Sequence, residues 1–178
     1  MGKLTEHFTE EELTYSATAI KYKQSNAPTA EHKQRLKTLC EKVLEPLRTF
    51  FNENYKMYKG KEVKYVIINP TSGYRSETVN KLLEKEGYHP SRTSQHCLGE
   101  AVDIQVKVVF KDGTKQDIPY TETYSFVKKL VKEGKLVTDQ VICEKQGSKV
   151  WVHISYTTRK PNRKQFLLYK NGQYINDW

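Results

Sequence analysis

Three short turn signals in the C-terminal part of the chain constrain its fold more than any other feature. They are Asp112-Gly113, Gly147-Ser148 and Asn171-Gly172, and each separates two segments rich in β-branched and aromatic residues. Two-residue connections of this kind join neighbouring antiparallel strands. The sequence therefore predicts three β-hairpins, with strand pairs AVDIQVKVVF and TKQDIPY, QVICEK and KVWVHISY, and QFLLYK and QYIND.

Helical patterns fill the N-terminal third of the chain. Thr9 and the glutamates after it have the spacing of a capping box, which predicts a short helix through about Ala19. Thr29 can cap a second helix, in which Pro46 predicts a kink or an early end. Apolar residues recur along this helix at three- and four-residue steps, which is typical of a core-facing stripe: Leu36, Leu39, Cys40, Val43, Leu44 and Leu47.

The middle of the chain alternates between strand and helix signals. The β-branched segment 63–69 predicts a buried strand that Pro70 ends. Helices are expected over 76–86, with Gly87 after the last turn, and over 122–133. The expected fold class is α+β, in which N-terminal helices precede a small antiparallel sheet interrupted by one helix.

Composition limits the class of protein. The 178 residues are 37% apolar and 29% charged, without a repeat or linker, so we expect one folded domain over 1–178. Three cysteines do not make a disulfide framework, and we expect reduced thiols. The start, MGKLTEHF, lacks the apolar core of a signal peptide, and no apolar run is long enough to span a membrane.

The chain is strongly basic. Thirty lysines and arginines against 21 acidic residues give a formal net charge of +9. This excess favours a polyanionic neighbour, which can be nucleic acid, an anionic membrane or an acidic bacterial envelope. The lysines are scattered along the chain, so a plain solvated surface explains them equally well.

The hairpin around Gly147-Ser148 carries potential chemistry. If these residues form a type II′ turn, Glu144 pairs with Trp151 and Ile142 pairs with His153. Side chains alternate between the faces of a strand, so these four residues share one face. A carboxylate and an imidazole thus become diagonal neighbours, within reach of one bound water.

A second segment, SQHCLGEAVDI, supplies His96 and Asp103 around a tight turn at Gly99. If the strand that begins near Asp103 lies beside the hairpin, these two residues and His153 converge on one point. Two imidazoles and one carboxylate with an open fourth position form a catalytic zinc set, and Glu144 is left free to act as general base. The alternatives are a core histidine at His153 and a loop cap at Asp103, and the residues by themselves leave both interpretations open.

Other interpretations of these residues rank lower. Non-haem iron oxygenases also use two histidines and one carboxylate, but they have no use for Glu144. A thiol ligand at Cys97 is disfavoured. Adjacent residues usually point in different directions, so Cys97 would point away from a metal ion that His96 binds. His89 is either an outer-shell residue or a plain loop residue.

These residues resemble the M15 zinc peptidases. The pattern SxHxxGxAxD, followed downstream by WVHIS, is similar to that family, which includes D-alanyl-D-alanine carboxypeptidases and phage endolysin peptidases and shares its fold with the hedgehog signalling domain. The pattern consists here of Ser94, His96, Gly99, Ala101 and Asp103. The resemblance extends to NPTSGYRSETVN, LTEHFTEEELTYS and LCEKVLEPLR, and so touches nearly the whole chain.

The resemblance implies a fold, a cofactor and residue roles. The fold would be hedgehog/DD-peptidase-like, and His96, Asp103 and His153 would bind one Zn²⁺ ion. Glu144 matches the catalytic acid of the family. Arg75 matches the arginine that binds a substrate carboxylate or steadies the carbonyl oxygen.

Two further residues are candidates for substrate contacts, and two segments depart from the family pattern. Ser94 and Trp151 adjoin the expected ligands and are the candidate substrate-binding residues, together with Arg75. The 86–93 loop is longer than the expected link, and the 107–120 hairpin looks inserted. Both segments are candidates for shaping the substrate groove.

The resulting expectation is a zinc-dependent metallopeptidase that hydrolyses peptide bonds of bacterial peptidoglycan, as a D-Ala-D-Ala carboxypeptidase or an endolysin-type endopeptidase. Its partner would be the peptidoglycan stem peptide, and we expect a monomer that waits in the cytoplasm and acts at the cell wall. The alternative is a non-catalytic, zinc-stabilised cell-wall-binding or virion module, although a structural zinc needs no spare carboxylate such as Glu144. Nucleic-acid binding is supported by charge alone.

Overall fold

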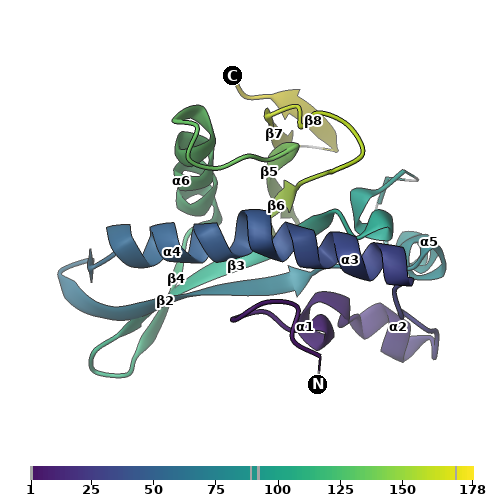
Figure 1. Ribbon diagram of the computed structural model, residues 1–178, viewed down its shortest axis with the longest axis horizontal. Helices are drawn as coiled ribbons and strands as arrows, with labels where there is room; N and C mark the ends of the chain where they lie inside the picture. The colour runs from purple at the N-terminus through teal and green to yellow at the C-terminus, as the bar shows by residue number, and fades with distance from the viewer. Residues whose placement is uncertain (1, 89, 92, 171) are drawn as a thin grey trace.

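The computed structural model describes residues 2–88, 90–91, 93–170 and 172–178. Within them, eight strands form one twisted sheet in the order β1-β2-β3-β6-β5-β7-β8, with β4 paired to β3 (Figure 1). The strands are β1 (Met57–Tyr58), β2 (Lys61–Ser72), β3 (Ala101–Phe110), β4 (Lys115–Ile118), β5 (Gln140–Gln146), β6 (Lys149–Ser155), β7 (Gln165–Lys170) and β8 (Gln173–Asn176).

The helices are α1 (Glu10–Thr14), α2 (Ala17–Lys21), α3 (Ala30–Leu39), the π-helical segment η1 (Cys40–Leu44), α4 (Glu45–Asn54), α5 (Glu77–Lys85), the 3₁₀ helix η2 (Gln95–Leu98) and α6 (Tyr120–Lys132). The segments α3, η1 and α4 form one continuous long helix, which lies across β2 and β3 (Figure 1). Within the described ranges, no helix combines the length and the apolar character needed to cross a membrane.

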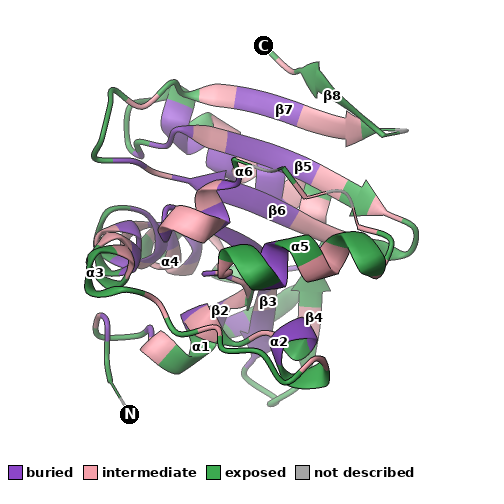
Figure 2. Cartoon of the chain, turned by 90° about the vertical axis from the view of Figure 1, so that its right-hand side faces the viewer, coloured by how far each residue is buried: buried purple, intermediate pink, exposed green. Residues whose placement is uncertain are grey.

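The core lies between one face of the sheet and the helices α3, α4 and α6. In β3, Val102 and Ile104 point into this core and are fully buried, whereas Asp103 between them points to the other face. Figure 2 shows the buried residues along the central strands and the more exposed α5 on the near side. The expected α+β class is confirmed, and the leucine stripe of the second helix is core.

The first helix is shorter than expected. Thr9 forms the capping box with Glu12, but α1 ends at Thr14, and the expected continuation through Ala19 is wrong. Ser16 has an extended backbone and caps a new helix, because its hydroxyl accepts a hydrogen bond from the N–H of Ala19 at 3.1 Å.

Pro46 changes the long helix without ending it. Cys40–Leu44 forms a π-helical turn, in which the N–H of Glu45 bonds to the carbonyl five residues earlier. Proline has no N–H, and its ring clashes with the carbonyl four residues earlier in a regular helix, so a wider turn relieves the conflict. The helix then continues to Asn54, so the early end predicted as one alternative at Pro46 is wrong. In place of the other alternative, a kink, the helix widens locally into the π-helical turn.

Pro70 does not end β2, contrary to expectation. The strand runs on to Ser72 and carries the chain towards Arg75. In the described part of the chain, β1 covers the outer edge of β2 only beside Lys61 and Glu62. Edge strands tolerate proline because no neighbour needs its missing N–H.

The three expected hairpins are present as the antiparallel pairs β3–β4, β5–β6 and β7–β8. Asn171, in the last turn, lies outside the described residues. The sheet is larger than expected and is not wholly antiparallel, because β7 pairs with β5 in parallel. The strand β6 ends beside the start of β5, so the 156–164 loop crosses that end and brings β7 in with the direction of β5. The helices expected over 76–86 and 122–133 are present as α5 and α6. Because the strand expected over 63–69 joins the same sheet as part of β2, both helices interrupt the sheet, where one interruption was expected.

Candidate metal centre

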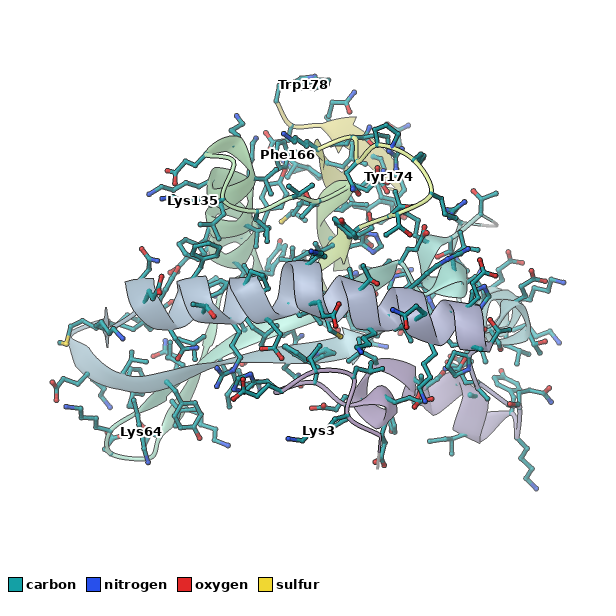
Figure 3. All side chains as sticks on the ribbon, viewed as in Figure 1. Lys3, Lys64, Lys135, Phe166, Tyr174 and Trp178 are labelled. Carbon is teal, nitrogen blue, oxygen red and sulfur yellow. The ribbon has the colours of Figure 1, made fainter. Side chains whose placement is uncertain are left out.

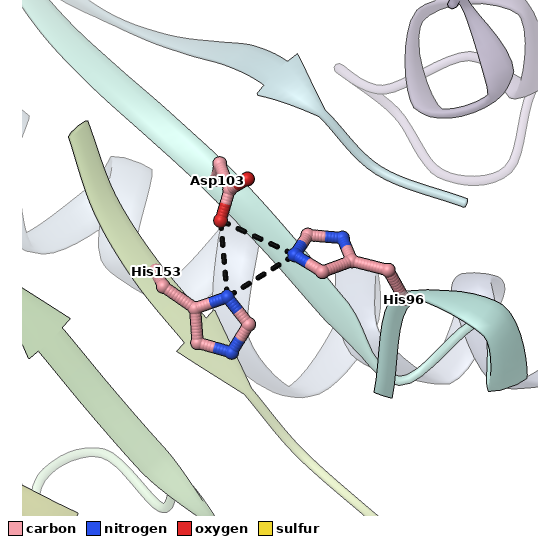
Figure 4. Close-up of side chains that lie close together, drawn as sticks. All are labelled: His96, Asp103 and His153. Carbon is pink, nitrogen blue, oxygen red and sulfur yellow. Dashed lines mark hydrogen bonds and ion pairs between the residues drawn. The ribbon is translucent and has the colours of Figure 1, made fainter. Parts of the chain in front are cut away.

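Three buried side chains converge on the face of the sheet opposite α6 (Figure 4). Asp103 of β3 and His153 of β6 are directly opposite each other in the antiparallel ladder, and His96 reaches the same point from η2. Nδ1 of His153 lies 3.0 Å from Oδ1 of Asp103 and 3.1 Å from Nε2 of His96. The remaining side of the triangle, from Nε2 of His96 to Oδ1 of Asp103, is 3.3 Å. The predicted convergence is confirmed.

This triangle fits a small tetrahedral cation. Zinc binds histidine nitrogen and carboxylate oxygen at about 2.0–2.2 Å, and tetrahedral ligands at that radius are about 3.3–3.6 Å apart. The observed edges of 3.0, 3.1 and 3.3 Å approach one face of such a tetrahedron, so a modest expansion accommodates an ion. The three residues can therefore hold a metal, and the fourth position of the tetrahedron is left to a ligand from outside this group.

The tautomer of His96 is set by its outer hydrogen bond. Nδ1 of His96 lies 2.7 Å from the carbonyl oxygen of Gly73. A carbonyl only accepts, so Nδ1 carries the proton and the lone pair of Nε2 faces the other two ligands. A side chain at Gly73 would place its Cβ 2.2 Å from the carbonyl oxygen of Leu13, so only glycine fits there. Gly73 carries one signal in the sequence, its position two residues before Arg75, and was not among the predicted site residues.

The turn that carries His96 needs a second glycine. Gly99 has φ = +70°, and a Cβ there would lie 2.4 Å from the carbonyl oxygen of His32, so the predicted tight turn is confirmed. Ser94 caps the start of the turn, because its hydroxyl accepts a hydrogen bond from the N–H of His96 at 3.3 Å. Ser94 also lines the groove, and its role in substrate binding stays a prediction.

Two buried carboxylates brace this turn on either side. Gln95 donates to Asp139 at 3.1 Å, and Arg163 donates to both oxygens of the same carboxylate at 3.0 and 2.6 Å. Glu100 accepts two hydrogen bonds from Arg159, at 2.7 and 2.8 Å. Asp139 and Glu100 are 0% and 1% exposed, so both pairs are well shielded at the acid. No sequence signal singled out these residues, because their partners come from a distant loop without a motif.

The protonation states of the ligands suit metal binding. Burial, together with the positive charge of Arg75, lowers the pKa of His96 to about 4, so the imidazole is neutral at pH 7. Burial by itself would raise the pKa of Asp103, but His96 and His153 outweigh it and hold that pKa well below its usual range. A neutral imidazole and an anionic carboxylate are the forms that bind a divalent cation.

Glu144 lies on the same face as the ligands, in the predicted register. It is directly opposite Trp151 in the β5–β6 hairpin, and Ile142 is opposite His153. Burial and the negative charge of Asp103 raise the pKa of Glu144 to about 7. A carboxyl group with this pKa can exchange a proton at neutral pH, as a general acid or base must.

Arg75 faces the same groove with an unused donor. Its backbone N–H bonds to the carbonyl of His96 at 3.2 Å, which fixes the residue beside the ligand turn. Its Nε atom is buried and has no hydrogen-bond partner among the described residues. An unpaired buried donor is unfavourable, so a ligand with a carboxylate or carbonyl oxygen would satisfy it.

The groove has a volume of about 740 Å³ and contains all seven predicted site residues. They are Arg75, Ser94, His96, Asp103, Glu144, Trp151 and His153. Cys97 also lines the groove, but it does not belong to the three-residue ligand group found among the described residues.

Of the two segments that depart from the family pattern, one shapes the groove. Tyr88, Pro90, Ser91 and Thr93 line it, and Gln146 at the tip of the β5–β6 hairpin bonds to the carbonyl of Gly87 at 3.1 Å. His89, in the same loop, lies outside the described residues. The 107–120 hairpin contributes no residue to the groove, so the idea that it shapes the site is wrong.

Comparisons with family models, with curated proteins and with solved structures gave no match. The membership in the M15 peptidases suggested by the sequence pattern therefore stays a prediction. The group of three residues that could hold a metal ion is defined by contacts within the fold of this chain, so its description does not depend on that prediction.

Proposed function

We propose that this protein is a zinc-dependent peptidase that hydrolyses peptide bonds of bacterial peptidoglycan. The observation that carries the proposal is the presence, in one groove, of three side chains that could hold a metal ion, a further carboxyl group, and a buried guanidinium nitrogen without a hydrogen-bond partner among the described residues. A structural metal site is usually closed by four protein ligands and needs neither Glu144 nor Arg75.

Zinc is the ion that suits these ligands best. Magnesium and calcium prefer oxygen-only sites with six or more ligands, whereas two imidazoles and one carboxylate are typical of catalytic zinc. Ferrous iron accepts the same donors in oxygenases, but those reactions give Glu144 no role. The sequence resemblance points to zinc as well, and to a hedgehog/DD-peptidase-like fold.

The residues of the groove divide the work of peptide hydrolysis. Zinc, when bound, acts as a Lewis acid that makes water a nucleophile near neutral pH. Glu144 takes a proton from the attacking water and then delivers it to the nitrogen of the leaving amine. Arg75 pairs with a substrate carboxylate or with the oxygen on which negative charge develops.

Peptidoglycan is the substrate class that the remaining observations favour. The net charge of +9 suits an anionic cell wall. The groove volume of about 740 Å³ lies within the usual range of ligand-binding sites. Arg75 would bind the terminal carboxylate if the enzyme is a carboxypeptidase, or a backbone oxygen if it is an endopeptidase. We propose a monomer that resides in the cytoplasm until release and then acts on stem peptides at the wall.

The test is digestion of purified peptidoglycan from several wall types by the zinc-loaded protein, with and without a chelator. Mass spectrometry of the products identifies the new termini and so the bond that is cut. We expect chelator-sensitive release of peptides or of D-alanine. No chelator-sensitive product from any wall type would refute the peptidase and favour the non-catalytic wall-binding or virion module.

A further inference from the structure

The C-terminal hairpin lies beside the metal centre although it supplies no ligand. Residues directly opposite one another form a row across four strands: Trp151 on β6, Glu144 on β5, Tyr169 on β7 and Tyr174 on β8. Paired residues on neighbouring strands share a face of the sheet. Glu144 is therefore flanked by an aromatic side chain on each side, and all four residues line the groove.

Tyr174 is the outermost member of this row. Its ring lies 4.9 Å from the ring of Tyr169, centroid to centroid, at an interplanar angle of 51°. Desolvation, followed by the negative charge of Glu144, raises the pKa of Tyr174 to about 12, and Asp103 and Arg75 also act on it. The phenol therefore keeps its proton at neutral pH and can donate a hydrogen bond.

The hydroxyl of Tyr174 has no hydrogen-bond partner within the described ranges, in contrast to those of other tyrosines of the fold. Tyr124 donates to Asp177 at 2.8 Å, and Tyr58 donates to Glu122 at 3.0 Å. Among the described residues, no hydrogen bond uses the Tyr174 hydroxyl. The residue is 54% exposed on the edge strand β8, so the fold does not require a polar group at this position.

The alternation of the hairpin explains why this side chain faces the groove. Phe166 of β7 packs into the core, with the ammonium group of Lys128 of α6 5.3 Å from its ring centroid. Tyr169, three residues further along the strand, points to the opposite face, and Tyr174 follows it by pairing. Figure 3 shows Tyr174 on the hairpin, while Trp178 extends from the end of the chain.

We propose that Tyr174 contacts the substrate, its hydroxyl donating a hydrogen bond to a carbonyl oxygen of the peptide that lies across Glu144. Tyr169 serves as the surface that holds the Tyr174 ring in place. This inference rests on the proposed peptidase function and adds a residue outside the sequence motifs to its site. The C-terminal hairpin then forms one wall of the peptide-binding groove.

The decisive variant is Tyr174→Phe, which removes the hydroxyl and keeps the ring. We expect kcat/KM for muropeptides to fall about tenfold to a hundredfold, as on removal of a hydrogen bond that strengthens in the transition state. Zinc content and melting temperature should stay at wild-type values. Tyr65→Phe is the matched control, because Tyr65 is an exposed tyrosine of β2 that does not line the groove, and it should change nothing.

Calorimetric titration of the same muropeptides into the zinc-loaded wild type and into Tyr174→Phe separates this inference from the function itself. The variant should bind about threefold to tenfold more weakly. Rates within twofold of wild type together with equal affinities would overturn the role of Tyr174 and leave the peptidase intact. A wild-type protein that does not hydrolyse the muropeptides would refute the peptidase function. The muropeptide affinities would then test Tyr174 by themselves. Equal affinities, or no binding at all, would count against its contact with the substrate.

Discussion

The substitution Gly73→Ala tests whether the outer hydrogen bond of His96 matters to the metal centre. The new Cβ would lie 2.2 Å from the carbonyl oxygen of Leu13, whereas real Cβ contacts are at least 3.0 Å. That oxygen is held by the N–H of Tyr74 at 2.6 Å, so the backbone at position 73 must move. The movement breaks the 2.7 Å hydrogen bond from His96, and loss of such an outer partner costs about 10- to 100-fold in metal affinity.

The same clash lowers stability. Overpacking of this kind costs about 1–3 kcal/mol, which for a chain of this size is a fall in melting temperature of roughly 4–8 °C at the middle of that range. The assays are competition of zinc with a chromogenic chelator and thermal unfolding. Gly113→Ala is the control: with φ = +84° and no atom within 4 Å, it should cost about 1 kcal/mol and leave zinc affinity unchanged. Wild-type zinc affinity in Gly73→Ala would show that the hydrogen bond from His96 to the carbonyl of Gly73 does not support metal binding.

Three further substitutions address the proposed roles. Glu144→Gln should retain stoichiometric zinc by elemental analysis and lose hydrolysis by about 10²- to 10⁴-fold, and near-wild-type turnover would remove Glu144 as the base. His96→Ala should lose the metal, so stoichiometric zinc in that variant would take His96 off the ligand set. Asp139→Asn should lower stability by about 2–3 kcal/mol at pH 7, because Arg163 and Gln95 lose their anionic partner. Burial raises the pKa of Asp139, but Arg163 more than offsets this effect and holds the pKa below the ordinary 3.8. The stability that this ion pair contributes is therefore fully present above pH 3.8 and is lost as the pH falls through the lowered pKa. The difference in the free energy of unfolding between the wild type and Asp139→Asn, measured with denaturant, should therefore shrink as the pH falls towards 3. A difference that stays constant with pH would contradict a stabilising ion pair at Asp139.

Local rules account for the parts of the site that lie on one hairpin. Gly147 has φ = +61° while Ser148 stays outside the left-handed region, as a type II′ turn requires, and this turn fixes the register that pairs Glu144 with Trp151. The alternation of side chains then places His153 on the face of Glu144. Both steps depend on near neighbours in sequence, so the sequence predicts them well.

The pairing of β3 with β6 depends on segments that are far apart in the sequence. The sequence analysis could therefore only assume that the strand of Asp103 lies beside the hairpin of His153. Asp103 and His153 are fifty residues apart in the chain and become neighbours through strand order, which no local pattern specifies. The parallel pairing of β7 with β5 was missed for the same reason.

The supports of the metal centre could not be predicted. Asp139 and Glu100 are ordinary acidic residues in a chain that is 29% charged, and their burial depends on Arg163 and Arg159 arriving from a later loop. Gly73 acts through its backbone carbonyl, which carries no residue-specific signal. Groups that act through long-range contacts of this kind become visible only in the folded chain.

The measurement that best tests zinc-dependent hydrolysis is the rate at which new peptide termini form in purified peptidoglycan when the metal-free protein receives one equivalent of zinc. We expect no release before zinc is added and full activity at one equivalent. Release that persists in chelator, or a zinc-loaded protein that generates no termini from any wall type, would contradict it.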